Sequence, residues 1–140
     1  MKDSIFHKTD IKTPAYVYDQ TAMLAVLIRL NELKNATGCK ILYSIKSANI
    51  KGLLEVIKPH VDGFSCSSLF ELKLAKEVLN PEQTTHITTP GYRNDEWHDI
   101  INLSNHITLN SVRQWRSHAV QVAQGSSCGI RINPELSFVK

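Results

Sequence analysis

Lys46 is the residue of this sequence whose type and position offer the clearest chemistry. It closes a short apolar run that begins at Ile41, and Ser47-Ala48-Asn49 follow it. A lysine inside a buried strand is rare, because taking an ammonium group out of water is costly. A lysine where a strand meets its loop can act as an amine nucleophile, because desolvation lowers its pKa and the neutral amine condenses with carbonyl groups. Lys46 is therefore the first candidate for a catalytic residue.

The elements that must position Lys46 alternate between strands and helices. A first strand is expected at Ala15–Tyr18, and Asp19 is expected to cap a helix that ends at Gly38. The later strands are expected at residues 40–46, 61–65, 85–89, 106–109 and 128–132. Helices are expected between these strands. Two of them begin with a capping box, Ser68 with Glu71 and Ser111 with Gln114, and two begin with a single N-cap residue, Asn49 or Asn94. Spacing within the helices places Trp97 and Trp115 in the core.

This alternation predicts an α/β fold with a parallel sheet. From Lys40 onward the strands recur at intervals of roughly 22 residues, which is typical of right-handed β-α-β units. The pattern fits both an open doubly wound sheet and part of a (β/α)8 barrel. In both folds, ligands bind at the carboxyl ends of the strands. The residues at or just past those ends are Lys46, Ser65, Thr89, Asn110 and Asn133.

Composition narrows the class of protein. The 140 residues suffice for one domain, and 42% hydrophobic with 21% charged residues indicate a soluble globular chain. The net charge of +3 comes with no basic cluster, so nucleic-acid binding is not expected. No apolar stretch approaches the ~20 residues of a membrane span, and the N-terminus lacks the apolar region of a signal peptide. Three widely spaced cysteines suit a reducing compartment, so a cytoplasmic location is expected.

Several common site motifs are absent from the sequence. There is no GxGxxG, GxxxxGK[ST] or GxSxG pattern, so neither a nucleotide-phosphate loop nor a hydrolase serine is indicated. The six histidines and three cysteines show no metal-ligand spacing, and we expect no metal site.

Four segments in order resemble the opening part of the fold-type III pyridoxal phosphate (PLP)-dependent decarboxylases. They are Thr13–Asp19, Tyr43–Asn49, Ser65–Leu72 and Gly129–Pro134. Three segments favour the carboxynorspermidine (carboxyspermidine) decarboxylases within this group: Asp62-Gly63-Phe64, Ser67–Leu72 and Arg131–Phe138. The resemblance covers essentially the whole chain, which would then be the N-terminal part of a PLP-binding barrel.

The resemblance implies roles for four residues. Lys46 matches the lysine that carries the cofactor and acts in catalysis. Ser65, Glu71 and Arg131 match positions near the cofactor, although relatives such as ornithine decarboxylase carry an aspartate where Ser65 stands. For each of the three a structural alternative remains: a strand-end serine, the acid of a capping box and an outward salt bridge. Asn49 matches a family residue that more simply caps the following helix.

The resemblance also implies parts that lie beyond this sequence. A complete barrel needs about 250 residues, and the family's phosphate loop and C-terminal β-domain fall later. We expect residues 1–140 to form one partial barrel domain, with residues 14–18 adding a strand to that β-domain. Family members are homodimers, and we expect this chain alone to lack substantial activity.

Three classes of function stay open. The first is a decarboxylase of a carboxylated polyamine, with diaminopimelate or another basic amino acid as the alternative substrate. The second is a PLP-binding barrel protein without catalytic activity. The third is a complete five-stranded domain that binds a small ligand or a partner.

Overall fold

The computed structural model describes residues 11–122 and 125–134. The chain divides into two compact units, one up to Cys39 and one from Lys40 onward. All the strands described lie in the second unit. The run Glu135–Phe138, which contributed to the resemblance, lies outside the described residues. Whether the whole chain forms one domain stays a prediction.

The first unit is built on α1 (Gln20–Thr37). The predicted caps are confirmed: the Asp19 side chain accepts a hydrogen bond from the Ala22 backbone nitrogen, and Gly38 ends the helix with a φ of 69°. The strand expected at Ala15–Tyr18 is not formed, since these residues are in neither helix nor strand. A strand exists only through hydrogen bonds to a neighbouring strand, and the pairing with a further β-domain stays a prediction.

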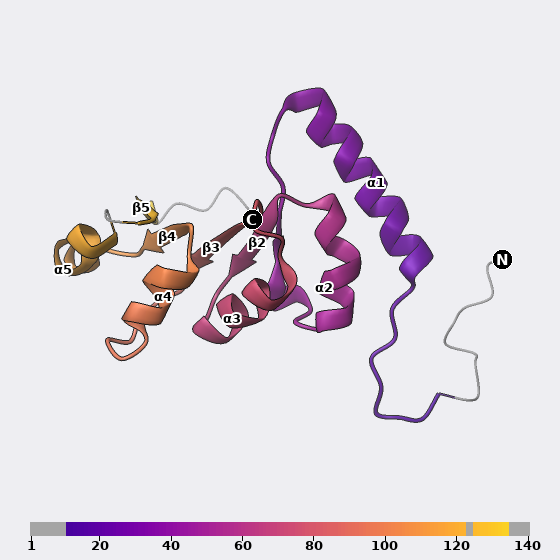
Figure 1. The fold of residues 1–140 in the computed structure, drawn as a ribbon, viewed down its shortest axis with the longest axis horizontal. Coiled ribbons are helices and arrows are strands. Elements are labelled where there is room, and N and C mark those ends of the chain that lie inside the picture. Colours follow the sequence, from indigo (N-terminus) through magenta and orange to yellow (C-terminus); the bar gives the residue numbers. More distant parts are fainter. Residues whose placement is uncertain (1–10, 123–124, 135–140) are drawn as a thin grey trace. The chain divides into compact units, whose positions relative to one another are not determined.

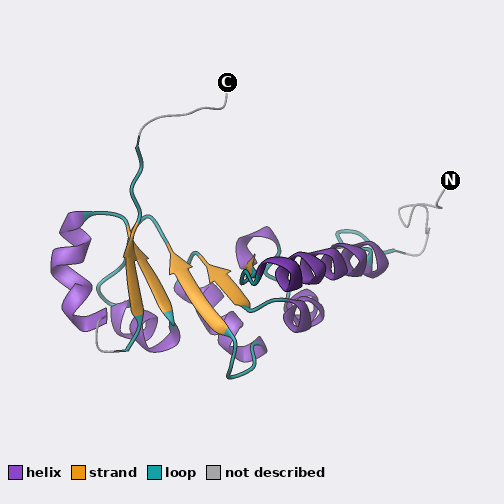
Figure 2. Ribbon diagram, turned by 90° about the horizontal axis from the view of Figure 1, so that it is seen from above, coloured by secondary structure: helices purple, strands orange, loops and turns teal. Residues whose placement is uncertain are grey.

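The second unit contains a five-stranded parallel sheet in the order β1-β2-β3-β4-β5 (Figure 2). The strands are β1 (Leu42–Ser44), β2 (Gly63–Cys66), β3 (Thr84–Thr88), β4 (His106–Leu109) and β5 (Ser127–Ile130). A doubly wound sheet reverses its strand order at a switch point, whereas this order runs without reversal. The sheet is therefore an arc of a (β/α) barrel, which decides between the two folds that the sequence left open.

Helices connect successive strands and form an outer arc around them (Figure 1). They are α2 (Lys51–Ile57), α3 (Leu69–Val78), α4 (Trp97–Leu103) and α5 (Val112–Val122), with short 3-10 helices η2 (Ile45–Ser47) and η3 (Lys58–His60). Right-handed crossovers between sequential parallel strands place all these helices on one face. None of the described helices is both long enough and apolar enough to cross a membrane.

The core of this unit lies between the helices and the outer face of the sheet. The strand side chains of this core are fully buried, and they include Phe64, Cys66, Ile87, Ile107 and Leu109. Burial of each of the larger apolar side chains contributes about 1.5–3 kcal/mol to the free energy of folding. Thr85 is buried among them and is satisfied, because its hydroxyl donates to the Leu103 carbonyl at 2.6 Å. Trp97 joins the core with 6% exposure as predicted, whereas Trp115 is 40% exposed.

Two predicted caps are wrong. α4 begins at Trp97 with Glu96 as its N-cap residue, and Asn94 lies in the preceding turn. α2 begins at Lys51 with Ile50 as its N-cap residue, so Asn49 does not cap it. Neither helix has a side-chain cap hydrogen bond. Their first turns are held instead by backbone bonds, such as Leu54 N to the Ile50 carbonyl at 3.0 Å.

Candidate functional site at the carboxyl edge of the sheet

Lys46 lies in the short turn that ends β1. Its neighbour Ile45 is fully buried, and the Ala48 backbone nitrogen donates to the Ile45 carbonyl at 3.0 Å. The Ser47 hydroxyl donates to the Ser44 carbonyl at 2.5 Å and tightens the same turn. The backbone at Lys46 is thus fixed by an apolar anchor and two local hydrogen bonds.

The Lys46 side chain itself is exposed. Within the described residues its amine makes no hydrogen bond or ion pair. The desolvation that the sequence suggested is therefore not supplied by this part of the chain. The amine is open to a reagent from solution.

Ser65 lies on β2 beside the end of β1. In the register of the sheet it pairs with Ser44 on one side and His86 on the other. Its neighbours Phe64 and Cys66 are buried under the helices, so Ser65 lies on the opposite, inner face. Burial, with the nearby Glu71 charge, raises the pKa of the Cys66 thiol to about 12. Cys66 is therefore a packed thiol and not a nucleophile.

Glu71 lies in the first turn of α3 and is buried. Its carboxylate accepts hydrogen bonds from the Ser67 backbone nitrogen at 2.6 Å and from the Ser67 hydroxyl at 3.0 Å. The Ser68 hydroxyl in turn accepts from the Glu71 backbone nitrogen at 3.2 Å. This is the predicted capping box shifted by one residue, because the carboxylate reaches Ser67 and not Ser68. The contacts support the structural role, and they place the carboxylate beside the first residue after β2.

Arg131 follows β5 and does not lie on it, since the strand ends at Ile130. Its backbone nitrogen still donates to the Leu109 carbonyl at 2.7 Å, which extends the pairing with β4. Its side chain lines a hollow of about 240 Å³ with Pro90, Asn110 and Asn133. Within the described ranges, no carboxylate lines this hollow and Arg131 forms no ion pair. The outward salt bridge is therefore not observed.

Asn110 ties the ends of two strands together on the rim of this hollow. Its amide donates to the Thr89 carbonyl, and its backbone nitrogen donates to the Gln114 side-chain oxygen at 2.7 Å. The Ser111 hydroxyl caps the helix by accepting from the Gln114 backbone nitrogen. The Gln114 side chain bonds to the residue just before Ser111, as the Glu71 side chain bonds to the residue just before Ser68 on α3. Asn110 was noted at a strand end, and its role as a link between β3 and β4 was not predicted.

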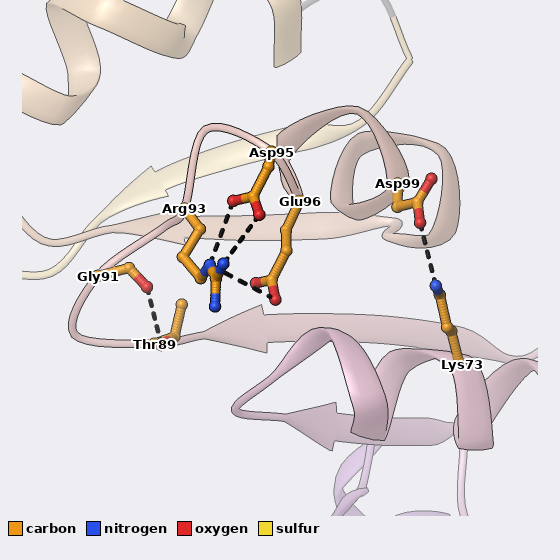
Figure 3. Close-up of polar contacts among 7 residues, drawn as sticks. All are labelled: Lys73, Thr89, Gly91, Arg93, Asp95, Glu96 and Asp99. Atoms are coloured by element: carbon orange, nitrogen blue, oxygen red, sulfur yellow. Dashed lines mark hydrogen bonds and ion pairs between the residues drawn. The ribbon is translucent and has the colours of Figure 1, made fainter.

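The loop from β3 to α4 is ordered by its own polar contacts (Figure 3). Thr89 donates to the Gly91 carbonyl at 3.2 Å, and Arg93 forms a two-bonded pair with Asp95 at 3.1 and 2.9 Å. Lys73 on α3 pairs with Asp99 on α4 at 3.1 Å. These exposed pairs contribute little to stability individually. They do leave the acids of the loop already neutralised.

Tyr92 fastens the same loop to the sheet. Its hydroxyl donates to the Thr108 carbonyl at 2.7 Å, and its ring meets Trp97 edge-on with centroids 5.3 Å apart. Burial raises the pKa of the Tyr92 phenol to about 12, so it remains a hydrogen-bond donor. The sequence analysis missed Tyr92, because nothing in its spacing indicates a loop residue that folds back onto strands.

The structure thus brings the candidates to one edge but not into one contact network. Parallel strands present their carboxyl ends at the same edge of the sheet. The residues that follow a strand at this edge are Lys46, Ser67 with its partner Glu71, Asn110 and Arg131. Ser65 lies one step inside that edge. Among the described residues no group of three or more His, Cys, Asp or Glu side chains could hold a metal ion.

The chain is similar in sequence to several known decarboxylases. No protein-family model matches it. It is 32% identical to the carboxynorspermidine/carboxyspermidine decarboxylase of Campylobacter jejuni over 91% of this chain and 33% of that protein. It is 29% identical to the carboxyaminopropylagmatine decarboxylase of a Synechocystis strain over 94% of this chain and 34% of that protein.

Solved structures show the same relationship. The crystal structure of C. jejuni carboxynorspermidine decarboxylase, complexed with norspermidine, matches 91% of this chain with a TM-score of 0.82 and 31% identity. A D-threonine aldolase from Filomicrobium marinum matches with a TM-score of 0.72 and 17% identity, which shows the fold alone. The chain spans about a third of the length of these proteins. The resemblance to the N-terminal portion of the fold-type III decarboxylases is confirmed.

Proposed function

We propose that this chain is the lysine-bearing part of a PLP-dependent decarboxylase that acts on a carboxylated polyamine. The observation that carries the proposal is the position of Lys46. It follows the first strand of a barrel arc that superimposes on the C. jejuni enzyme with a TM-score of 0.82. An amine that is fixed through its backbone and open at its tip suits covalent attachment of an aldehyde cofactor.

The residues at the carboxyl edge fit PLP by their chemistry. Lys46 supplies the amine, and the described residues that line the hollow at Arg131 include a guanidinium and two amides. These donors suit an anionic or phenolic oxygen of the cofactor. When bound, PLP supplies an electron sink for the charge left by the departing carboxylate. Arg131 would hold the cofactor, and Ser65 and Glu71 would border it.

The proposed substrate is carboxynorspermidine or carboxyspermidine. Similarity to the Synechocystis protein favours carboxyaminopropylagmatine as a second candidate, which is also a carboxylated polyamine. We further propose a homodimer, as in the family. Three free cysteines suit a reducing, cytoplasmic location.

The decisive activity test supplies the portion of the relatives that this chain does not span. The chain is joined to the remaining two thirds of the C. jejuni enzyme, and carbon dioxide release is measured with each carboxylated polyamine and with diaminopimelate. We expect release from a polyamine substrate, lost by at least about 10²-fold in Lys46→Ala. Lys40→Ala, just before the same strand at its opposite end, is the matched control and should keep full activity.

Two results would contradict the proposal. If the joined protein binds PLP but releases no carbon dioxide from any of these substrates, the chain belongs to a non-catalytic PLP-binding barrel. If Lys46→Ala releases carbon dioxide as fast as Lys40→Ala, Lys46 is not the catalytic lysine.

A further inference from the structure

Asn110 and Arg131 stand opposite each other just past the ends of β4 and β5. The last pair of these strands is Leu109 with Ile130, so the next step of the register pairs Asn110 with Arg131. The backbone keeps this register, because the Arg131 nitrogen donates to the Leu109 carbonyl at 2.7 Å. Leu109 is fully buried beneath the helices, and side chains alternate between the faces of a strand. Asn110 and Arg131 therefore project toward the inner side of the arc.

Pro90 continues the same row on the side of β3. The last pair of β3 and β4 is Thr88 with Thr108, so two further steps of the register pair Pro90 with Asn110. Proline has no backbone N–H group and cannot extend a ladder of strand hydrogen bonds. The ladder between β3 and β4 therefore stops before Pro90, at the carboxyl edge of the sheet.

Two side-chain hydrogen bonds hold these strand ends together where the ladder stops. The Asn110 amide donates to the Thr89 carbonyl. The Tyr92 hydroxyl, from the loop after β3, donates to the Thr108 carbonyl of β4 at 2.7 Å. Because the residues on both sides of Pro90 are tied to β4 or its end, the two bonds fix the position of Pro90 relative to Asn110.

Pro90, Asn110 and Arg131, together with Asn133, line the hollow of about 240 Å³. Arg131 carries the only charge among the described residues that line it. A guanidinium presents planar N–H donors that match the oxygens of a carboxylate or a phosphate. The hollow therefore suits an oxyanion.

Tyr92 is not among the described residues that line this hollow. Its ring packs edge-on against Trp97, with centroids 5.3 Å apart. The Tyr92 hydroxyl can therefore influence the hollow only through the backbone that it holds.

We propose that Asn110 and Tyr92 are positioning residues, which hold Pro90 and Arg131 on the two sides of an oxyanion site above the ends of β3, β4 and β5. Arg131 binds the oxyanion, and the two positioning residues set the width of the site. The oxyanion is an oxygen group of the cofactor or the carboxylate of the substrate. The naming of these two ligands rests on the proposed function.

The test uses the chain joined to the remaining two thirds of the C. jejuni enzyme. Tyr92→Phe removes only the hydroxyl, and Asn110→Ala removes the amide. Asn110→Asp keeps the size of the side chain, but it cannot donate to a carbonyl and it puts a carboxylate beside Arg131. Thr85→Val is the matched control, because it removes a hydroxyl that donates to the Leu103 carbonyl at 2.6 Å near the start of β3.

Four quantities are measured for each variant: the Kd of PLP, the KM and kcat for the carboxylated polyamine, and the melting temperature. We expect one of the two ligands to bind more weakly, by about threefold in Tyr92→Phe, about fivefold in Asn110→Ala and about tenfold or more in Asn110→Asp, because the new carboxylate competes for the guanidinium. Thr85→Val should lower the melting temperature and leave both affinities unchanged. A raised Kd of PLP identifies the oxyanion as the cofactor's, and a raised KM at unchanged PLP affinity identifies it as the substrate's carboxylate.

A purely structural role for Asn110 would make Asn110→Asp, which keeps the volume, the milder of its two variants. That order, or equal affinities in Tyr92→Phe and Thr85→Val, overturns the inference. If Asn110→Ala does not fold, Tyr92→Phe and Asn110→Asp decide the matter by the same comparison with Thr85→Val. If the joined protein without these substitutions shows no PLP binding that Lys46→Ala removes, the proposed function fails and the inference fails with it.

Discussion

The Glu71 carboxylate accepts two hydrogen bonds from Ser67, one from its backbone nitrogen and one from its hydroxyl, at 2.6 and 3.0 Å. Ser67 is the first residue after β2, and Glu71 lies in the first turn of α3. One carboxylate therefore fastens the start of a helix to the end of a strand. That junction is at the edge where ligands bind in this fold.

Substitution of Glu71 separates its structural role from a role at the cofactor. Glu71→Ala leaves the Ser67 nitrogen without its partner, so we expect the free energy of unfolding to fall by about 1–2 kcal/mol. Glu71→Gln keeps an acceptor oxygen and should keep most of that stability. Urea unfolding of both variants measures the difference. The matched control is Gln114→Ala on α5, where the side chain makes the equivalent bond to Asn110 at 2.7 Å.

PLP affinity provides the second readout for Glu71. If Glu71 borders the cofactor, Glu71→Gln should bind PLP more weakly than the unmodified chain. Equal affinities of Glu71→Gln and the unmodified chain would show that Glu71 only caps the helix.

These two side-chain bonds show which part of the helix caps could be predicted from the sequence and which part could not. Serine followed three residues later by Glu or Gln predicted where α3 and α5 begin, and this is confirmed because the pattern depends only on local geometry. The acceptor was wrong by one residue, since the carboxylate can reach the nitrogen of Ser67 as well as that of Ser68. At Asn94 the local pattern failed entirely, because a turn intervenes before Trp97.

Gly63 is the position where β2 and β3 approach most closely among the described glycines. A Cβ atom there would lie 2.0 Å from the Thr84 carbonyl oxygen, which is backbone of the neighbouring strand and cannot turn away. Gly63→Ala should therefore destabilise the sheet by more than about 3 kcal/mol or prevent folding. Gly52→Ala is the matched control, because nothing lies near a Cβ at that helical position. It should be neutral or stabilise by up to about 1 kcal/mol.

Thermal unfolding followed by circular dichroism compares these two alanine variants. Equal melting temperatures for Gly63→Ala and Gly52→Ala would mean that the close approach of β2 and β3 does not occur.

The rings of His86 on β3 and His106 on β4 lie against each other, and this pair was missed at the sequence level although a signal was present. The two histidines are 20 residues apart, close to the strand repeat, and each lies in a predicted strand. Spacing alone does not say which face of a strand a residue occupies until the register is known. The register, which puts the two rings against each other, comes from tertiary structure. Arg131 was placed on a strand that ends one residue earlier, because the end of a strand is set by its pairing with the neighbouring strand, which the sequence does not show.

Acid should destabilise the chain through His86. Its pKa in the folded chain is about 4, below the ordinary 6.5, so the unfolded chain binds a proton more readily. The stability contributed by the neutral imidazole is full above pH 6.5 and is lost as the pH falls toward 4. Melting temperatures between pH 7 and 4.5 should therefore fall more steeply for the natural chain than for His86→Gln.

The group responsible can be checked by a second substitution. His98→Gln alters an exposed histidine that bonds Asn102 on the same helix, and it should follow the natural chain. Parallel pH curves for the natural chain and His86→Gln would show that His86 is not held neutral by its burial and by its neighbours His106 and Lys40.

The most direct test of the account is chemical trapping at Lys46. The chain, joined to the remaining two thirds of the C. jejuni enzyme, is incubated with PLP, reduced with borohydride and digested, and the modified peptide is identified by mass spectrometry. The account predicts one dominant site, Lys46, which Lys40→Ala leaves unchanged and Lys46→Ala abolishes. Labelling spread evenly over the surface lysines, or concentrated at another lysine while Lys46 stays unmodified, would contradict it.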